Sequence, residues 1–459
     1  MFKALKRDRA FYGYLLRLTG PIALQNLITF SLGLIDTLMV SQLGNNEMAA
    51  VTAANVPVFL LISIVFGVQS GVGILISQYW GKKDLPSISR AIGVAAGLGV
   101  ALALVIALAL FLWPVQIMDL MSNKHHLSLL GAPYLRVIGF SYVFNMLSSI
   151  YVSAQRSVEN ASFGMKLFGM STVLNTGMNY LLIFGKCGFP MLGVEGAAIA
   201  TVLAQVISLV WQLRILSNKQ ELLHFRRGIW QLRKTIVTGI LSIGMAPCLV
   251  NVCGSAVTVA INRQLADHGG DLAIGAYGII NRILILFAML VIGLTQGMQP
   301  IIGYNHGAMK PARVLLTLKY GVLAGTSFTT LGFLACVFFP RGIAGLFTDD
   351  ASLISLAANG LLICVLAFPL IGSQIIIGNF FQAIGKARLA IFLSLTRQML
   401  FLLPFLLVLP RFWGQDGIWA SLPLADVLSF IVTLLFIRRF LKYYRLKNRH
   451  YLVPGTGKA

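Results

Sequence analysis

The chain has 459 residues, of which 57% are hydrophobic and 11% are charged, and its mean hydropathy is +0.83. This composition excludes a water-soluble globular protein, because so few polar residues cannot cover its surface. The formal net charge of +22 would suit nucleic acid only if the basic residues shared one folded face with aromatic side chains between them. They are instead spread over short segments between apolar runs, so no nucleic-acid partner is expected.

Apolar runs of roughly 20 residues, the length of a helix that crosses a bilayer, recur about twelve times along the chain. Residues 1–16 form a basic lead-in, and residues 17–216 contain six runs. A charged connector at 217–235 precedes six further runs in 236–440, and a basic tail follows at 441–459. The pattern predicts an all-α integral membrane protein of twelve transmembrane helices in two six-helix lobes.

The two halves of the chain repeat each other. A shift of 226 positions aligns Pro21 with Pro247, Asn55 with Asn281 and Gly71 with Gly297, along with further pairs. Six spans per half keep both halves in one orientation, so the predicted relation is a parallel pseudo-two-fold axis along the membrane normal. Two such bundles facing a cleft suit a transporter that works by alternating access.

Basic residues mark the predicted cytoplasmic side, because short cytoplasmic loops of membrane proteins are rich in lysine and arginine. They gather in alternate connections and at both ends of the chain, which predicts a multi-pass protein of the inner or plasma membrane with both termini in the cytoplasm. Members of these basic segments are Lys82, Lys83, Arg90, Arg156, Lys166, Lys310, Arg313, Lys319, Lys386 and Arg388.

Asp36 is the first candidate functional residue, because it lies deep in the first apolar run. A carboxylate at that depth costs several kcal/mol unless it is paired, hydrated or protonated, so it should face a cavity. We expect it to exchange a proton or bind a cation near neutral pH. The alternative is a structural carboxylate that is hydrogen-bonded to a neighbouring helix.

Asn175, Asn179 and Thr201 are candidate partners of Asp36 in the same half. The two asparagines are four residues apart and therefore lie on one helix face. Amide carbonyl and hydroxyl oxygens suit Na⁺ or a proton-binding carboxyl group. Asparagine amides also pack membrane helices together, and a threonine in a Gly-Ala-Ala run can serve close packing, so structural roles stay open for all three residues.

The second half lacks an equivalent acid, since the counterpart of Asp36 is Asn262. Asp426, beside Pro423, is predicted near the start of the last helix, where it would bind a cation or interact with the helix dipole. Arg282 and Arg397 lie in apolar runs, so each is expected to pair with a carboxylate or to extend toward the membrane surface.

A set of ordered and partly duplicated motifs extends over essentially the whole chain, and it resembles the multidrug and toxic compound extrusion (MATE) family, most closely its bacterial MepA-type branch. No single motif is specific, but their order and spacing are. The motifs are Pro21, Asp36-Thr37-Leu38-Met39-Val40, Gly44, Gly71, Gly81-Lys82-Lys83-Asp84, Asn175, Asn179-Tyr180, Gly193 to Thr201, Gly297-Met298-Gln299-Pro300, Gly307, Phe381 to Lys386, Gly417 to Ala420, Pro423 and Asp426.

The resemblance implies a secondary active transporter that exports amphipathic, cationic organic compounds in exchange for H⁺ or Na⁺, with the aspartate that matches Asp36 taking part in coupling. Some relatives with a cation site have a second aspartate where this chain has Asn179, so a bound Na⁺ would lose one charged ligand here. Two alternatives are a lipid-linked oligosaccharide flippase of the same superfamily and an integral-membrane sugar transferase. The first would need a basic cavity, and the second would need clustered carboxylates or a large outer loop.

The chain is accordingly expected not to be an enzyme. No Gly-x-x-x-x-Gly-Lys-Ser/Thr motif occurs, so its own ATP hydrolysis is not expected to drive transport. We expect no cofactor, no metal ion other than Na⁺ at Asp36, and a monomer in the lipid bilayer whose partners are small organic cations or drugs. The sequence assigns no substrate-binding residue.

Overall fold

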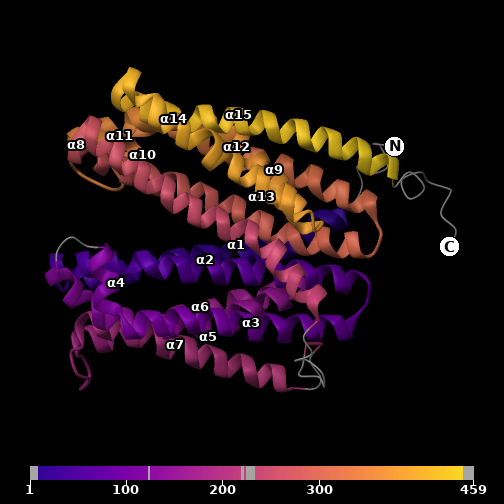
Figure 1. Cartoon of the computed structure of the whole chain (residues 1–459), viewed down its shortest axis with the longest axis horizontal. Helices are drawn as coiled ribbons and strands as arrows, with labels where there is room; N and C mark the ends of the chain where they lie inside the picture. Colours follow the sequence, from indigo (N-terminus) through magenta and orange to yellow (C-terminus); the bar gives the residue numbers. More distant parts are fainter. Residues whose placement is uncertain (1–8, 122–124, 219–221, 224–232, 448–459) are drawn as a thin grey trace. The chain divides into compact units, whose positions relative to one another are not determined.

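The computed structural model describes residues 9–121, 125–218, 222–223 and 233–447. Within these ranges the chain is helical and contains no strand (Figure 1). Helices satisfy their own backbone hydrogen bonds, which is the requirement for a chain of this hydropathy in lipid. Residues 1–8 of the predicted lead-in, most of the predicted connector and residues 448–459 of the predicted tail lie outside the described residues.

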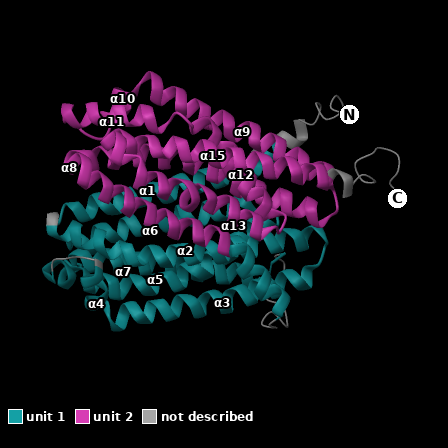
Figure 2. Cartoon of the chain, turned by 45° about the horizontal axis from the view of Figure 1, so that its top comes forward, with its two compact units in different colours: residues 1–244 teal, residues 245–459 magenta. Residues whose placement is uncertain are grey.

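The chain divides into two compact units, Met1–Gly244 and Met245–Ala459 (Figure 2). The helices of unit 1 are α1 (Arg9–Ser41), α2 (Asn45–Gly81), α3 (Leu85–Leu112), α4 (Pro114–Met121), α5 (His125–Ser157), α6 (Ala161–Phe184), α7 (Gly193–Ser217) and the first turns of α8 (Lys234–Gly307).

Unit 2 begins within α8 and contains a π-helix among its later elements. These are α9 (Pro311–Phe338), α10 (Pro340–Ala344), α11 (Ala351–Cys364), α12 (Phe368–Ala383), α13 (Ala387–Leu395), the π-helix η2 (Thr396–Leu402), α14 (Leu403–Val408) and α15 (Pro410–Lys447).

The helices of the described ranges account for twelve membrane spans. Ten are long and apolar enough to cross a bilayer, and the pair α11 and α12, which meet at a bend of 57°, forms an eleventh. α8 has 74 residues, and its backbone leaves helical geometry at Gly270, where φ is 66° and ψ is −165°. A helix of that length would extend for about 110 Å, far beyond the roughly 30 Å of hydrocarbon, so α8 is two spans joined at Gly270. The predicted number of twelve is confirmed.

Unit 1 packs α2 against α3 and α5, and α6 against α1 and α7. One of its apolar clusters brings together Val40 of α1, Leu135 of α5, Ile183 of α6 and Ala198 of α7. This cluster fixes the three helices α1, α6 and α7 next to one another. Their polar residues are therefore held at defined positions.

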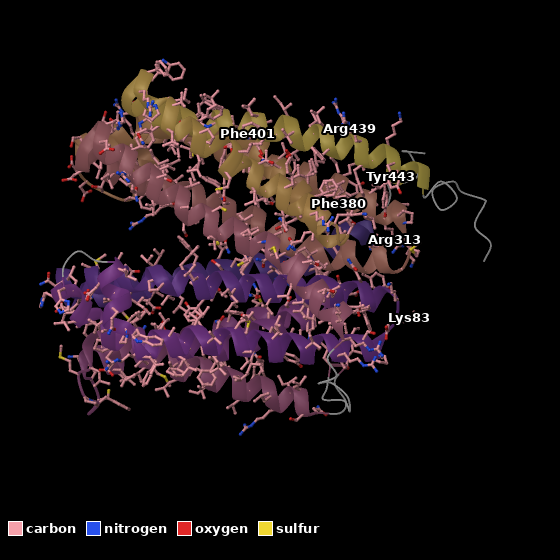
Figure 3. The ribbon with its side chains drawn as sticks, in the orientation of Figure 1. Lys83, Arg313, Phe380, Phe401, Arg439 and Tyr443 are labelled. Atoms are coloured by element: carbon pink, nitrogen blue, oxygen red, sulfur yellow. The ribbon has the colours of Figure 1, made fainter. Side chains whose placement is uncertain are left out.

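Unit 2 has an apolar core centred on Trp419 of α15, which is 1% exposed. Phe380 and Phe381 of α12 form a second aromatic group with Phe440 of α15, with ring centroids 6.0 Å and 5.1 Å from Phe440. Figure 3 labels Phe380 within unit 2, where it is buried, and Arg439 on α15 next to Phe440, where it is exposed. Phe380 and Phe381 are thus buried, and a basic residue is exposed beside Phe440.

Candidate functional site

Four polar residues from three helices of unit 1 form one hydrogen-bonded network. Asn179 of α6 donates from Nδ2 to Oδ1 of Asp36 in α1 over 2.6 Å, and the same amide donates to Oδ1 of Asn175 over 3.0 Å. Asn175 in turn donates from Nδ2 to Oγ1 of Thr201 in α7, also over 3.0 Å. The structure therefore brings together all four residues that the sequence singled out, although their roles in transport remain predictions.

The hydrogen bonds of the network share one donor-to-acceptor direction from Asn179 through Asn175 to Thr201. Thr201 passes its hydroxyl hydrogen to the carbonyl of Ala197 one turn earlier, so every polar hydrogen beyond Asn179 is directed away from Asp36. In this arrangement Asp36 accepts a hydrogen bond, which both an ionised and a protonated carboxyl group can do. Hydrogen bonds from a neutral donor to an ionised acceptor are stronger than those between neutral groups, so the bond from Asn179 favours the ionised form of Asp36 over the neutral one.

Burial differs along the network. Asn175 and Asn179 are 2% and 1% exposed, whereas Asp36 is half-buried. The carboxylate is thus accessible on one side and anchored on the other. Oδ1 of Asn179 is buried and has no hydrogen-bond partner, so the amide that holds Asp36 also carries an unused acceptor beside it.

Asp36 lies in the last two turns of α1. α1 continues only to Ser41, which places Asp36 about 8 Å from the end of the helix at 1.5 Å per residue. The chain turns there because Gly44 adopts φ of 142°, a conformation that glycine tolerates. Asp36 thus lies toward the end of α1 opposite its N-terminus, inside the apolar span Arg17–Ser41, and its depth in the membrane stays a prediction.

Close packing of α6 against α7 sets the position of Thr201. A Cβ atom on Gly196 would lie 2.7 Å from the carbonyl oxygen of Leu182, so a glycine is needed for the two backbones to approach there. Leu182 is close in sequence to Asn179, and Gly196 is close to Thr201. The contact therefore holds the two polar positions within hydrogen-bonding distance.

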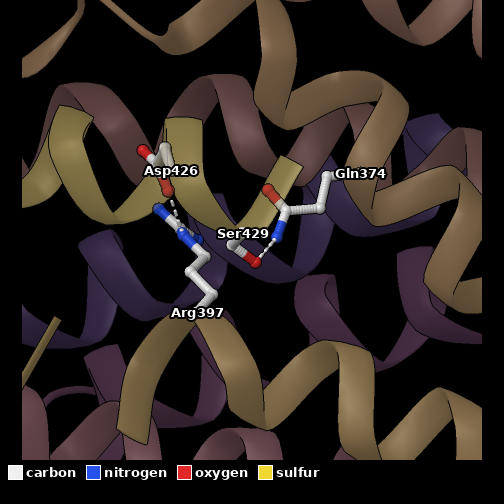
Figure 4. Close-up of polar contacts among 4 residues, drawn as sticks. All are labelled: Gln374, Arg397, Asp426 and Ser429. Carbon is white, nitrogen blue, oxygen red and sulfur yellow. Dashed lines mark hydrogen bonds and ion pairs between the residues drawn. The ribbon is translucent and has the colours of Figure 1, made fainter. Parts of the chain in front are cut away.

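Unit 2 holds a different polar pair. Arg397 of η2 donates from Nε to Oδ1 of Asp426 in α15 (Figure 4). The Asp426 side chain is 2% exposed and that of Arg397 is 32% exposed, so this is a buried ion pair with a partly open guanidinium. Of the two roles considered for Arg397, pairing with a carboxylate is the one that the structure supports.

Asp426 is not at a helix start, in contrast to the prediction. α15 begins at Pro410, and its one departure from helical geometry is at Gly414, so Asp426 and Pro423 both lie inside the helix. Proline is tolerated within membrane helices because neighbouring groups satisfy the freed carbonyl. Pro423 therefore suggested a helix boundary that does not exist.

The π-helix that holds Arg397 has a local cause. Pro404 lies in the first turn of α14, directly after η2. Its ring lacks an N–H and clashes with the carbonyl four residues earlier, so the preceding turn widens. The sequence analysis missed this feature, and it also missed the neighbouring hydrogen bond from Gln374 to Ser429 (Figure 4). Both polar residues lie in apolar runs, which was the available signal.

The remaining candidates do not join either network. Arg282 is exposed, and no ion pair of Arg282 occurs among the residues that the structure describes. Asn262, the repeat counterpart of Asp36, is half-buried. Within the described ranges, no group of three or more histidine, cysteine, aspartate or glutamate side chains is arranged to hold a metal ion.

The model of the MatE family matches residues 21–181 and 243–408. The chain belongs to the MatE family. The matched segments include Asp36 and the greater part of both units, so the predicted membership is confirmed and the chain has a transporter role.

Curated relatives of this MatE protein match over nearly the full length of both chains. The uncharacterized transporter YisQ of Bacillus subtilis is 25% identical over 99% of this chain and 98% of its own. The multidrug export protein MepA of Staphylococcus saprophyticus is 24% identical over 97% of this chain and 96% of its own. These matches agree with the predicted resemblance to the MepA-type branch.

Solved structures confirm the fold of this MatE protein. The structure of the MATE multidrug transporter DinF-BH is 28% identical in sequence, has a TM-score of 0.84, and is matched over 93% of this chain and 95% of its own. The all-α membrane architecture that the sequence predicted is the architecture of this neighbour.

Proposed function

We propose that this protein is a secondary active multidrug exporter that exchanges amphipathic, cationic organic compounds for protons, with Asp36 as the proton-carrying group. The observation that supports it is the half-buried carboxylate of Asp36, held by the amide of Asn179 at 2.6 Å. Ionisable groups within membrane spans are costly and mark ion or substrate pathways. The names of relatives such as MepA support the drug-export part of the proposal.

The position of Asp36 supports entry of the proton from outside the cell. The carboxylate lies toward the end of α1 opposite the N-terminus, and the positive-inside pattern predicts a cytoplasmic N-terminus. A proton arriving from outside would thus reach Asp36 without crossing most of the span. Antiport requires this direction, because the inward proton gradient drives export.

Protonation changes the hydrogen bonding of Asp36 in a defined way. The neutral carboxyl group accepts more weakly and gains an O–H donor, while Oδ1 of Asn179 is an unused acceptor next to it. Rotation of the Asn179 amide would serve the new donor but break its bond to Asn175. The contact of α1 with α6 and α7 would therefore differ between the two protonation states, as a coupled transporter requires.

The small number of free oxygen ligands around Asp36 favours a proton over Na⁺ as the coupling ion. A sodium site needs several oxygen ligands, but Asn175 Oδ1 and Thr201 Oγ1 already accept hydrogen bonds. One carboxylate and one unpaired amide oxygen remain. The second aspartate that some relatives have is Asn179 here, so the charge available for a cation is smaller.

The test is efflux of a fluorescent cationic dye from proteoliposomes that contain the full chain, under separately imposed proton and sodium gradients. We expect the proton gradient to drive dye movement and the sodium gradient to have no effect. An Asp36→Asn variant should lose the response, whereas Asp350→Asn, a change at an exposed position outside the spans, should retain it. Transport driven by sodium alone, or by neither gradient, would overturn the proposal.

A further inference from the structure

A small pocket lies in unit 1 between the end of α5, the start of α6 and the last turns of α7. Its volume is about 190 Å³. The pocket shares α6 and α7 with the Asp36 network, but Lys166 and Trp211 lie about 14 Å along these helices from Asn175 and Thr201, and transport as proposed above does not use the pocket. It is lined by Gln155, Asn160, Ser162, Phe163, Lys166, Trp211 and Ile215.

The walls of the pocket are fixed by contacts among the lining residues. Phe163 stacks on Trp211 with ring centroids 5.4 Å apart and an interplanar angle of 6°. Asn160 donates from Nδ2 to Oε1 of Gln155 over 3.1 Å, and Gln155 donates to the hydroxyl of Tyr151 over 2.8 Å. An aromatic wall thus faces a polar wall, and both are held in place without a ligand.

The lining is cationic and rich in hydrogen-bond donors. Lys166 is its charged residue, and no aspartate or glutamate is among the lining side chains. Lys166 and Ser162 are both exposed and are placed to donate to a ligand. The side chain of Asn160 makes no cap bond to the first turn of α6, and backbone N–H groups at the start of a helix can bind phosphate.

The position of the pocket relative to the ends of the spans indicates the source of its ligand. The turn from Ser157 to Ala161 joins α5 to α6, and α7 ends at Ser217, so the pocket lies where these spans end. Tryptophan is enriched at that level of a membrane, and the basic residues of this connection predict the cytoplasmic side. Phosphate groups of the inner leaflet lie at the same level.

We propose that this pocket binds the phosphate headgroup of an anionic phospholipid of the inner leaflet. Lys166, Ser162 and the start of α6 would bind the phosphate oxygens, while Trp211, Phe163 and Ile215 would contact the glycerol and the first acyl carbons. Basic pockets between membrane helices on the cytoplasmic side bind such headgroups. The apolar wall gives a lipid an advantage over free phosphate, because free phosphate would leave the aromatic surface without a contact.

The experiment is native mass spectrometry of the delipidated full chain, titrated separately with phosphatidylglycerol, phosphatidylcholine and inorganic phosphate. We expect phosphatidylglycerol to bind most tightly, and Lys166→Gln to weaken it about tenfold or more, since hydrogen bonds to charged groups contribute about 1.5–3 kcal/mol. Lys166→Arg should preserve binding. Lys186→Gln changes the lysine just beyond the other end of α6 and should have no effect.

Two results would overturn the proposal. The first is equal binding of phosphatidylglycerol by the Lys166→Gln variant and the original chain. The second is binding of inorganic phosphate as tightly as phosphatidylglycerol, which would assign the pocket to a free anion. The measurement needs no ion gradient, so its failure would leave the proposed proton antiport unaffected.

Discussion

The side-chain amide of Asn179 lies 2.6 Å from the carboxylate of Asp36, although 143 residues separate them in the chain. Asn179 is 1% exposed, so the amide is a fixed donor in the interior of unit 1. Asp36 is half-buried, so the other side of its carboxylate is accessible. A charge that is held on one side and accessible on the other is suited to gain and lose a proton repeatedly.

Replacement of Asn179 by leucine should weaken the coupling of proton binding at Asp36 to transport, while leaving Asp36 in place. The change removes the hydrogen bond to the carboxylate, which is worth about 1.5–3 kcal/mol. We expect proton-driven dye efflux to fall at least about tenfold. The matched control is Asn262→Leu at the repeat counterpart of Asp36, which should transport at close to the original rate. Equal loss in both variants would argue against a special role for Asn179.

The ion pair between Arg397 and Asp426 should show a large non-additive effect on stability. Arg397→Met leaves the buried charge of Asp426 uncompensated and should lower the free energy of unfolding by about 3–5 kcal/mol, whereas Asp426→Leu leaves a guanidinium that is 32% exposed and should lower it by less. The double variant should be more stable than either single variant, because no charge is then left alone. A denaturant titration of the purified protein measures all four states of the cycle.

Arg282→Met is the control for that cycle. Arg282 is exposed, and its replacement should change the free energy of unfolding by less than about 0.5 kcal/mol. If the double variant lost as much stability as the two single variants together, the two side chains would not act as a pair.

Asp350 provides a pH-dependent contribution to stability outside the membrane spans. Its carboxylate accepts from the hydroxyl of Ser352 over 2.6 Å and from the backbone N–H groups of Ser352 and Leu353 at the start of α11. These bonds lower the pKa of Asp350, with the Ser352 hydroxyl as the largest cause. Because the pKa of Asp350 is lower in the folded state, its carboxylate stabilises the fold at pH values above the unfolded-state pKa of about 4. This stabilisation is lost as the pH falls through the folded-state pKa.

Asp350→Ala should therefore lower the thermal midpoint at pH 7, and the difference from the original chain should shrink as the pH falls below about 4. Thermal unfolding in detergent across that pH range measures it. Asp349→Ala, which changes the neighbouring exposed aspartate, should have little effect at any pH. A difference that is constant across the range would show that the cap does not act through its charge.

The sequence predicted the features that depend on composition and local spacing. Hydropathy located the spans, because each must cover the bilayer thickness, and the four-residue spacing placed Asn175 and Asn179 on one helix face. The pairing of Arg397 with Asp426 could not be predicted, because it depends on how two helices pack. The interior position of Pro423 and the widened turn before Pro404 were also missed, since a proline alone does not distinguish a helix boundary from a local distortion.

Proton release upon substrate binding is the measurement that tests the role of Asp36 most directly. Purified protein in a weakly buffered solution near neutral pH would be mixed with a cationic dye, and a pH indicator would report released protons while dye anisotropy reports binding. We predict that the original chain releases protons as it binds the dye, and that Asp36→Asn binds the dye without releasing any. Equal proton release by the two proteins would contradict the account, because another group would then carry the coupled proton.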